Sequence, residues 1–352
     1  MTRRKKDPHR LRLGFVALTD AAPLIVAAEH GLFARHGLEV ELSREIGWAT
    51  MRDKILYGEL DAAHALGGML FSSALGVGAP ATDVMTACVL NLNGNAITIS
   101  RTLWDAGVHT AHDLREEIQR LKGTRRLNFG VVYSSSFHHV QLREWLRSGG
   151  IDPDRDVRTV VVPPAQMFRN LSAGTIDGCC VGEPWNSLAV AQGAGCIVSW
   201  SSSQFPNHIE KVLMVRTTFA ETRAREHRAL IGALLEACAW CDRVENRFEL
   251  VKMLAQPRHL NLAAEHIAPA LTGPFALGAG REIPADDFVI FHRENTNVPC
   301  HVRAELLLQR LVASDIIADS HALDRNLISR LFREDIFSQI VQPDNPHETA
   351  LV

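Results

Sequence analysis

The chain has 352 residues, of which 46% are apolar, and its 37 basic and 40 acidic residues leave a net charge of −3 at pH 7. This length favours two domains over one, and the apolar content is enough for more than one core. The nearly balanced charge gives no indication of direct nucleic-acid binding or of a membrane-surface partner. We therefore expect a small ligand or a protein partner.

The seven cysteines form an odd set without disulfide-like spacing, and most lie in apolar runs, which favours a reducing compartment. Cys238-Ala-Trp-Cys241 is a CxxC, but it lies inside a long helical pattern and not at a helix start after a strand. We interpret it as two buried helical thiols. The sequence has no second CxxC to complete a zinc site, so neither a metal nor a cofactor is expected.

The N-terminus begins with the basic run Thr2 to Lys6, which is typical of a signal peptide. The apolar run that follows, Leu11 to Leu18, has only eight residues and contains Arg12, so it predicts a first β-strand and not a signal sequence. No later run is long enough to span a bilayer. These features predict a cytoplasmic protein, with disordered tails at 1–10 and 342–352.

The next elements are a helix from Asp20 to His36 and a short strand at 38–42. Thr50 followed by Asp53 resembles a capping box, which predicts a helix that begins at Thr50 and leaves Trp48 in the loop at its mouth. Such strand-to-helix loops are where ligands bind in open α/β sheets, and helix starts favour anions. Trp48 is expected either to wall a pocket or to pack against the sheet edge.

Alternating strands and helices continue along the chain and predict parallel sheets. A polar break at Asn91 to Asn95 allows the chain to leave one domain for another. After a strand at 211–215, long helices are expected to fill the chain to about residue 337. The remaining predicted strands are 61–66, 83–90, 96–100, 127–132, 157–162, 176–181 and 196–200, and the predicted helices between them are 69–75, 111–121, 136–147, 165–173 and 185–192.

Motifs for catalysis are missing: the sequence has no GxSxG, HExxH, P-loop or complete GxGxxG. His138, in the first turn of a helix after a strand end, occupies the same kind of position as Trp48 in the other domain. Two interpretations are open for it, a ligand contact or a solvated helix-start histidine. His64, inside an apolar strand, is interpreted as a hydrogen-bonded core residue.

Several motifs are found along the chain, among them Glu29-His30-Gly31-Leu32-Phe33, Trp48-Ala49-Thr50-Met51-Arg52-Asp53, Gly182-Glu183-Pro184-Trp185-Asn186 and His208-Ile209-Glu210-Lys211. Together they resemble the nitrate-binding proteins of the cyanobacterial-type nitrate/bicarbonate uptake family. The resemblance runs from residue 11 to about residue 311 and implies a two-lobed fold of the type II periplasmic-binding-protein class, with the ligand in the cleft between the lobes.

The resemblance implies a nitrate site made by Trp48, the backbone near Thr50, Asn95, His138 and Lys211. Asn95 stands where the family usually has Gln, one methylene longer, so its amide can reach the anion directly or through a water. Nitrate needs N–H donors, one positive charge and no acceptor, and Lys211 supplies the charge. The bicarbonate binders of this resemblance have an acidic residue where Lys211 stands.

The energetic prediction concerns Lys211, the only cation assigned to the site. Its replacement by Glu is expected to cost about 2–5 kcal/mol of nitrate binding and to leave stability almost unchanged.

Without an export or lipid-anchor signal, the chain resembles the cytoplasmic NasS-type nitrate/nitrite sensors. In these, the fold is thought to hold an RNA-binding antitermination regulator and to release it when nitrate or nitrite binds. Two alternatives stay open: an uptake binding protein of a nitrate ABC transporter that lacks its leader, and an enzyme on the same fold. A donor-only pocket without a positioned base argues against the enzyme.

The predicted domain division has lobe one at 11–96 and 208–340 and lobe two at 97–207. The crossovers between the lobes are expected near 95–101 and 207–211.

Overall fold

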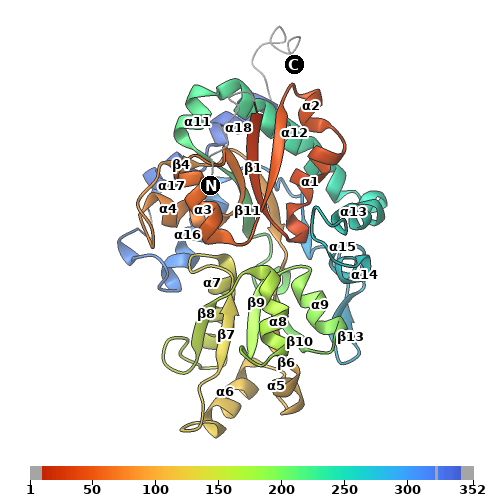
Figure 1. Cartoon of the computed structure of the whole chain (residues 1–352). Coiled ribbons are helices and arrows are strands. Elements are labelled where there is room, and N and C mark those ends of the chain that lie inside the picture. The colour runs from red at the N-terminus through yellow and green to blue at the C-terminus, as the bar shows by residue number, and fades with distance from the viewer. Residues whose placement is uncertain (1–9, 322–323, 342–352) are drawn as a thin grey trace, which may run out of the picture.

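The computed structural model describes residues 10–321 and 324–341, so the predicted disordered tails lie outside the described residues except for Arg10, which begins the first strand. Two sheets, one above the other in Figure 1, form the cores of two lobes. No helix in these described ranges is long and apolar enough to cross a membrane.

The first sheet has the strand order β14-β5-β11-β3-β1-β2, and β4 also pairs with β11. β1 runs parallel to β2 and β3, but β11 runs antiparallel to β3, β4 and β5. The prediction of parallel sheets is therefore wrong for this lobe, because the chain enters the sheet again from the other lobe in the opposite direction. Its strands are β1 (Arg10–Val16), β2 (Glu39–Glu45), β3 (Ala62–Leu66), β4 (Val84–Met85), β5 (Val89–Asn93), β11 (Ile209–Arg216) and β14 (Val289–Ile290).

The second sheet has the order β10-β6-β9-β7-β8 and is also mixed, because β6 is antiparallel to both β9 and β10. Strand membership changes from the first sheet to the second at Gly94 (φ +106°), so the polar break is shorter than predicted. The chain returns to the first sheet between Trp200 and Ile209. The strands of the second sheet are β6 (Asn95–Ser100), β7 (Asn128–Val131), β8 (Arg158–Val161), β9 (Gly178–Gly182) and β10 (Gly195–Trp200).

Helices cover both sheets (Figure 1). The predicted helix at 20–36 is broken at Gly31 (φ +65°) into two helices. In the first half of the chain the helices are η1 (Thr19–Ala21), α1 (Ala22–Glu29), α2 (Leu32–Arg35), α3 (Trp48–Leu56), α4 (Gly67–Ala74), α5 (Arg101–Asp105), α6 (Ala111–Arg120), α7 (Phe137–Ser148), η2 (Pro164–Gln166), α8 (Met167–Ser172), α9 (Trp185–Ala191) and α10 (Ser201–Gln204).

The C-terminal part holds helices, as predicted, but also a hairpin of β12 and β13 that the sequence did not indicate. The hairpin packs on the second sheet, where the Arg281 guanidinium donates to the Ile197 carbonyl at 2.8 Å. The elements are α11 (Thr217–Thr222), α12 (Ala224–Asp242), η3 (Val244–Asn246), α13 (Arg247–Leu254), α14 (Ala264–Ile267), α15 (Pro269–Thr272), β12 (Phe275–Gly278), β13 (Arg281–Ile283), α16 (His301–Ala313), η4 (Asp319–His321), α17 (Arg325–Leu331) and α18 (Glu334–Val341).

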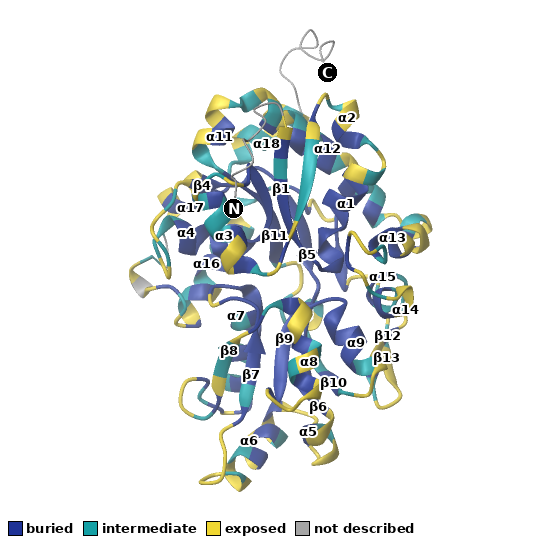
Figure 2. Cartoon of the chain, viewed as in Figure 1, coloured by how far each residue is buried: buried dark blue, intermediate teal, exposed yellow. Residues whose placement is uncertain are grey.

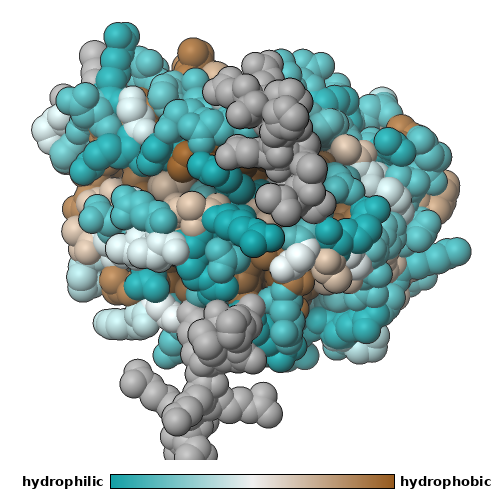
Figure 3. Space-filling model, turned by 90° about the horizontal axis from the view of Figure 1, so that it is seen from above, coloured by the Kyte–Doolittle hydropathy of each residue, from teal (hydrophilic) through white to brown (hydrophobic). Residues whose placement is uncertain are grey.

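Most strands of both sheets are buried, the edge strands β2 and β8 are partly exposed, and most exposed residues lie on the outer helices and loops (Figure 2). Seen from above, the first lobe presents mainly hydrophilic residues with hydrophobic ones interspersed (Figure 3). One apolar cluster continues from the first lobe into the second, since it contains Met69 and Met214 together with Phe137 and Val181. Burial of this shared surface stabilises the arrangement of the lobes.

Polar contacts fix the lobes where they meet. The Thr19 N–H donates to the Glu183 carbonyl at 2.8 Å, and the Trp185 indole donates to the Ala17 carbonyl at 3.1 Å. A Cβ at Gly68 would lie 2.1 Å from the Ser135 carbonyl oxygen, so only glycine allows α4 this close to the start of α7. The residues beside these contacts form the candidate site.

Candidate functional site

Lys211 is the centre of a buried charged cluster between the lobes. Its Nζ lies 2.6 Å from Asp20 Oδ2 and 2.7 Å from Glu210 Oε1, and all three side chains are almost fully buried. Glu210 and Lys211 are neighbours on β11, whose register against β5 shifts on both sides of Lys211. This irregularity lets neighbouring side chains both reach the cluster, where a regular strand would point them to opposite faces.

The charges of this cluster hold one another ionised. Burial opposes the charge on Lys211, but attraction to Asp20 and Glu210 outweighs it and raises the pKa of Lys211. Burial likewise opposes ionisation of the two carboxyls, but Lys211 lowers the pKa of Asp20 and brings the pKa of Glu210 well below its usual range. The cluster therefore contains two carboxylates and one ammonium.

Three histidines surround the carboxylates. His64 Nε2 lies 3.0 Å from Asp20 Oδ1, His208 Nε2 lies 3.3 Å from Glu210 Oε2, and His138 Nδ1 lies 3.5 Å from Glu210 Oε1. Burial lowers the pKa of His138 to about 4 despite the opposing attraction of Glu210, and burial also lowers the pKa of His64. Both rings are thus neutral at pH 7.

Several buried polar atoms of the cluster have no hydrogen-bond partner in the protein. They include the Trp48 indole nitrogen, His138 Nε2, His64 Nδ1 and Asn95 Oδ1. Each unpaired buried polar atom costs about 1–3 kcal/mol. Such atoms indicate that the cluster is built to receive a polar ligand.

Trp48 joins the cluster through its ring. The Lys211 Nζ is 5.4 Å from the Trp48 ring centroid, and the Trp48 and His64 ring centroids are 5.8 Å apart. The indole is almost fully buried, so it walls the site and does not pack on an open sheet edge. The interpretation of His138 as a solvated helix-start histidine is wrong, because its ring is fully buried.

The predicted helix start at Thr50 is wrong. α3 begins at Trp48 after Gly47, no side chain caps it, and Asp53 instead accepts from Arg52 Nε at 2.8 Å. Trp48 therefore lies in the first turn, where the amide groups have no acceptor within the helix. The Thr50 side chain is exposed, so only its backbone remains a candidate contact.

Four of the five predicted site residues meet here: Trp48, Asn95, His138 and Lys211. Asn95 Nδ2 donates to Glu210 Oε2 at 2.7 Å, so its amide first orients that carboxylate and has one N–H left for another acceptor. The side chain of the fifth residue, Thr50, does not reach the cluster.

The predicted pocket without acceptors is wrong, because Asp20 and Glu210 contact the cation directly. Neither carboxylate was assigned to the site from the sequence, and His64 was assigned to the core. The signal for Glu210 was its place beside Lys211 in the His208-Ile209-Glu210-Lys211 motif. Asp20 gave no local signal, since it had been interpreted only as the residue that starts a helix.

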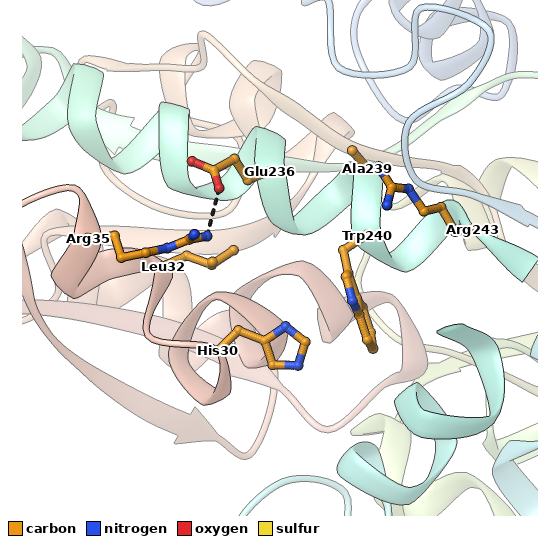
Figure 4. A pocket seen from close by; sticks show the side chains of 7 residues that line it. All are labelled: His30, Leu32, Arg35, Glu236, Ala239, Trp240 and Arg243. Atoms are coloured by element: carbon orange, nitrogen blue, oxygen red, sulfur yellow. Dashed lines mark hydrogen bonds and ion pairs between the residues drawn. The ribbon is translucent and has the colours of Figure 1, made fainter. Parts of the chain in front are cut away.

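A separate pocket of about 580 Å³ lies on the first lobe between α1, α2 and α12 (Figure 4). The His30 and Trp240 rings meet there edge to face, with their centroids 4.6 Å apart, and Arg35 Nη2 lies 2.8 Å from Glu236 Oε2. Its lining includes none of the five predicted site residues. Within residues 10–321 and 324–341, no group of His, Cys, Asp or Glu is arranged to hold a metal ion.

Comparison with known proteins gives the family. The model of the NMT1-like family matches residues 4–255, more than half of the chain. The chain is 39% identical over 332 residues to the nitrate import ATP-binding protein NrtC of Synechocystis sp., which covers 94% of this chain and 49% of that protein. It is 43% identical over 259 residues to the bicarbonate transport ATP-binding protein CmpC of the same organism, covering 73% and 39%. The chain thus spans about half or less of these two relatives.

The nitrate/nitrite binding protein NrtA of Synechocystis sp. is 30% identical over 342 residues, covering 94% of this chain and 76% of that protein. The crystal structure of the periplasmic nitrate-binding protein NrtA from Synechocystis matches with a TM-score of 0.90 and 28% identity over 97% of this chain and 90% of that chain. A structure of the alkanesulfonate-binding protein SsuA from Xanthomonas axonopodis, at 16% identity and a TM-score of 0.65, over 94% of this chain and 98% of that chain, shares the fold alone. The chain therefore belongs to the NMT1-like family, is related to the NrtA proteins, and has the two-lobed periplasmic-binding-protein fold that the sequence predicts.

Proposed function

We propose that this protein binds nitrate or nitrite in the cluster around Lys211 and acts as a cytoplasmic sensor of that anion. The observation that carries the binding proposal is the set of unpaired buried donors, the Trp48 indole N–H and the His138 ring, beside the Lys211 ammonium. An anion with several oxygen acceptors satisfies them together. The relationship to the NrtA proteins supports the same ligand.

We propose a role for each group of the cluster. Lys211 has three N–H donors, and Asp20 and Glu210 take two of them, which leaves one for the anion. Trp48, His138 and the amides of the first turn of α3 supply the others. Asn95 holds Glu210 in place and contributes its second N–H directly or through water.

The positions of the site residues support the sensor role. Lys211 and Trp48 belong to the first lobe, whereas His138 lies in the first turn of α7 in the second lobe. An anion held between them favours one arrangement of the lobes, and a protein partner that prefers the other arrangement is then released. We propose an RNA-binding antitermination regulator as that partner.

A second candidate function is delivery of the anion to an ABC transporter, which the relatives NrtC and NrtA favour. A second candidate ligand is bicarbonate, because Asp20 and Glu210 can accept its O–H and the chain is 43% identical to CmpC. The enzyme alternative has weaker support. The desulfurization enzyme DszB, at 15% identity and a TM-score of 0.60, over 94% of this chain and 98% of that chain, shares only the fold.

Calorimetric titration with nitrate, nitrite, bicarbonate and sulfate tests the ligand. We expect nitrate or nitrite to bind with one site per chain and sulfate to give no heat. Heat with bicarbonate alone would replace nitrate by the second candidate ligand.

Size-exclusion chromatography with an antitermination-type regulator tests the sensor role. We expect a complex in nitrate-free buffer that separates when nitrate or nitrite is added. Linkage requires the regulator to weaken nitrate binding by the same factor, typically 1–3 kcal/mol. A complex that persists at saturating nitrate, or that forms only with nitrate, would refute this mechanism.

A further inference from the structure

A second pocket, of about 620 Å³, lies at the outer end of the second lobe, and the anion-binding proposal does not involve it. It is formed by the end of α6 with the turn that follows it and by the loop between α7 and β8. Figure 1 shows α6 at the end of the lobe that points away from the first lobe. The pocket is thus well separated from Lys211.

The lining of this pocket is strongly basic. Five cations, Arg115, Lys122, Arg125, Arg126 and Arg155, face one lining carboxylate, Asp156. The whole chain, in contrast, has a net charge of −3. Charges of one sign around a hollow focus the field and attract an oppositely charged ligand.

Two of these cations are already paired and three are not. Arg125 pairs with Asp177, and Arg155 pairs with Asp152 at 2.7 Å. Arg126 donates to the Asp154 backbone carbonyl. Arg115, Lys122 and Arg126 form no ion pair with any of the residues that the structure describes. Within this part of the chain, three positive charges of the pocket are therefore not paired with a carboxylate.

The backbone brings these cations together. Gly150 has φ +73°, and a Cβ there would lie 2.7 Å from Arg115 Nη1, so the Arg115 side chain lies across this glycine. Gly123, at φ +87°, turns the chain directly after Lys122. Ile151, which is buried, supplies an apolar part of the wall. The pocket is thus a hollow with cations around it and not a flat basic stripe.

We propose that this pocket binds a small molecule with two or more linked phosphate groups. Guanidinium groups match phosphate oxygens in a bidentate manner, and a compact polyanion satisfies several separate cations at once. The volume is in the range of small-molecule sites. A nucleoside triphosphate and an inorganic polyphosphate share this chemistry, and a nucleic acid would need an extended basic surface.

Calorimetric titrations of the full chain in 150 mM NaCl test the proposal with tripolyphosphate, ATP and sulfate. We expect tripolyphosphate to bind with one site per chain and at least tenfold more tightly than sulfate. Binding of ATP as well would identify a nucleotide source, and its absence an inorganic one. The Lys122→Ala/Arg126→Ala variant is expected to lose at least tenfold in affinity. Lys252→Ala, an exposed lysine of α13 outside the pocket, is the matched control and should change nothing.

The thermal unfolding midpoint of each variant shows whether it folds. If the Lys122→Ala/Arg126→Ala variant does not fold, Arg115→Ala is used in its place. The proposal is overturned if tripolyphosphate gives no heat, if the variant binds as tightly as wild type, or if binding appears only at 20 mM salt. A twelve-nucleotide RNA is also titrated. If it binds more tightly than tripolyphosphate and ATP, and if the same variant loses this binding, the basic residues form a nucleic-acid surface instead.

Discussion

Lys211 Nζ lies 2.6 Å from Asp20 Oδ2, and both side chains are buried. This pair joins β11, where the chain returns from the second lobe, to the start of the first helix. The ammonium is therefore a structural group as well as a candidate ligand. This contact argues against the expectation that Lys211 can be replaced with little effect on stability.

Loss of the ammonium should destabilise the protein strongly. In Lys211→Met the carboxylates of Asp20 and Glu210 lose their common cation, and we expect the free energy of unfolding to fall by about 3–5 kcal/mol. Urea denaturation measures this. The Glu210→Gln/Lys211→Met variant removes one orphaned carboxylate, so it should lose less than the sum of the two single changes. Additive losses would contradict the pairing.

Removal of the Trp48 indole N–H should weaken nitrate binding without the loss of a hydrogen bond that stabilises the fold. Trp48 Nε1 has no partner in the protein, so Trp48→Phe should lose stability only through the packing of the missing ring atoms, and it should weaken nitrate binding by about 1–3 kcal/mol. Trp185→Phe is the matched control, since its indole donates to the Ala17 carbonyl. It should cost about 1 kcal/mol more stability than Trp48→Phe, because it also loses this hydrogen bond. Equal nitrate affinity in wild type and Trp48→Phe would exclude this indole from the site.

Nitrate binding should tighten as the pH falls from 8 to 5. Before any histidine takes up a proton, the cluster has more carboxylates than cations, and an added anion increases this excess. Burial holds the pKa of His138 at about 4, while Asp20, His208, Glu210 and Lys211 also act on it. A bound anion raises the pKa of His138. At a pH below this raised pKa, each anion that binds brings a proton with it, so the nitrate affinity rises by up to tenfold for each unit by which the pH falls.

Titrations in two buffers with different ionisation enthalpies count these protons. His138→Gln keeps a neutral N–H donor but has no group that titrates between pH 5 and 8. Its nitrate binding should therefore take up no proton at this position. Binding without proton uptake in the wild type would contradict this linkage while leaving anion binding intact. Glu183 also titrates in this range. Glu183→Gln is therefore the control that shows whether Glu183 contributes to the proton uptake.

Glu183 should make the protein less stable at high pH. Burial raises the pKa of its carboxyl to about 7, and one oxygen has no hydrogen-bond partner. The folded state therefore keeps a proton that the unfolded chain releases, so stability is greatest below about pH 4.5 for this group and falls as the pH rises to about 7. Glu183→Gln should be more stable than wild type at pH 8 by on the order of 2–3 kcal/mol. Denaturation curves at pH 5 and pH 8 test this, and an equal difference at both values would contradict it.

Local patterns predicted much of the fold. The apolar run at 11–18 and the alternating elements after it correspond to β1 and to most later strands and helices. The hairpin at Phe275–Gly278 and Arg281–Ile283 was missed because its strands are short and are joined by the turn Gly278-Ala279-Gly280. Its place depends on packing, since a Cβ at Gly278 would lie 2.9 Å from Cys196 Sγ.

The site was only partly predictable for a similar reason. Trp48, His138 and Lys211 carry recognisable motifs, but the contact of Asp20 with Lys211 joins segments that are far apart in the chain. The capping pattern at Thr50 and Asp53 also gave the wrong helix start. The helix begins at Trp48 instead, where the indole is buried.

A crystal structure of the protein grown with nitrate tests the central claim most directly. We expect a planar anion with its oxygens about 2.7–3.2 Å from the Trp48 indole nitrogen, a ring nitrogen of His138 and Lys211 Nζ. Nitrate absent from this cluster at saturating concentration, or bound only elsewhere on the protein, would contradict it.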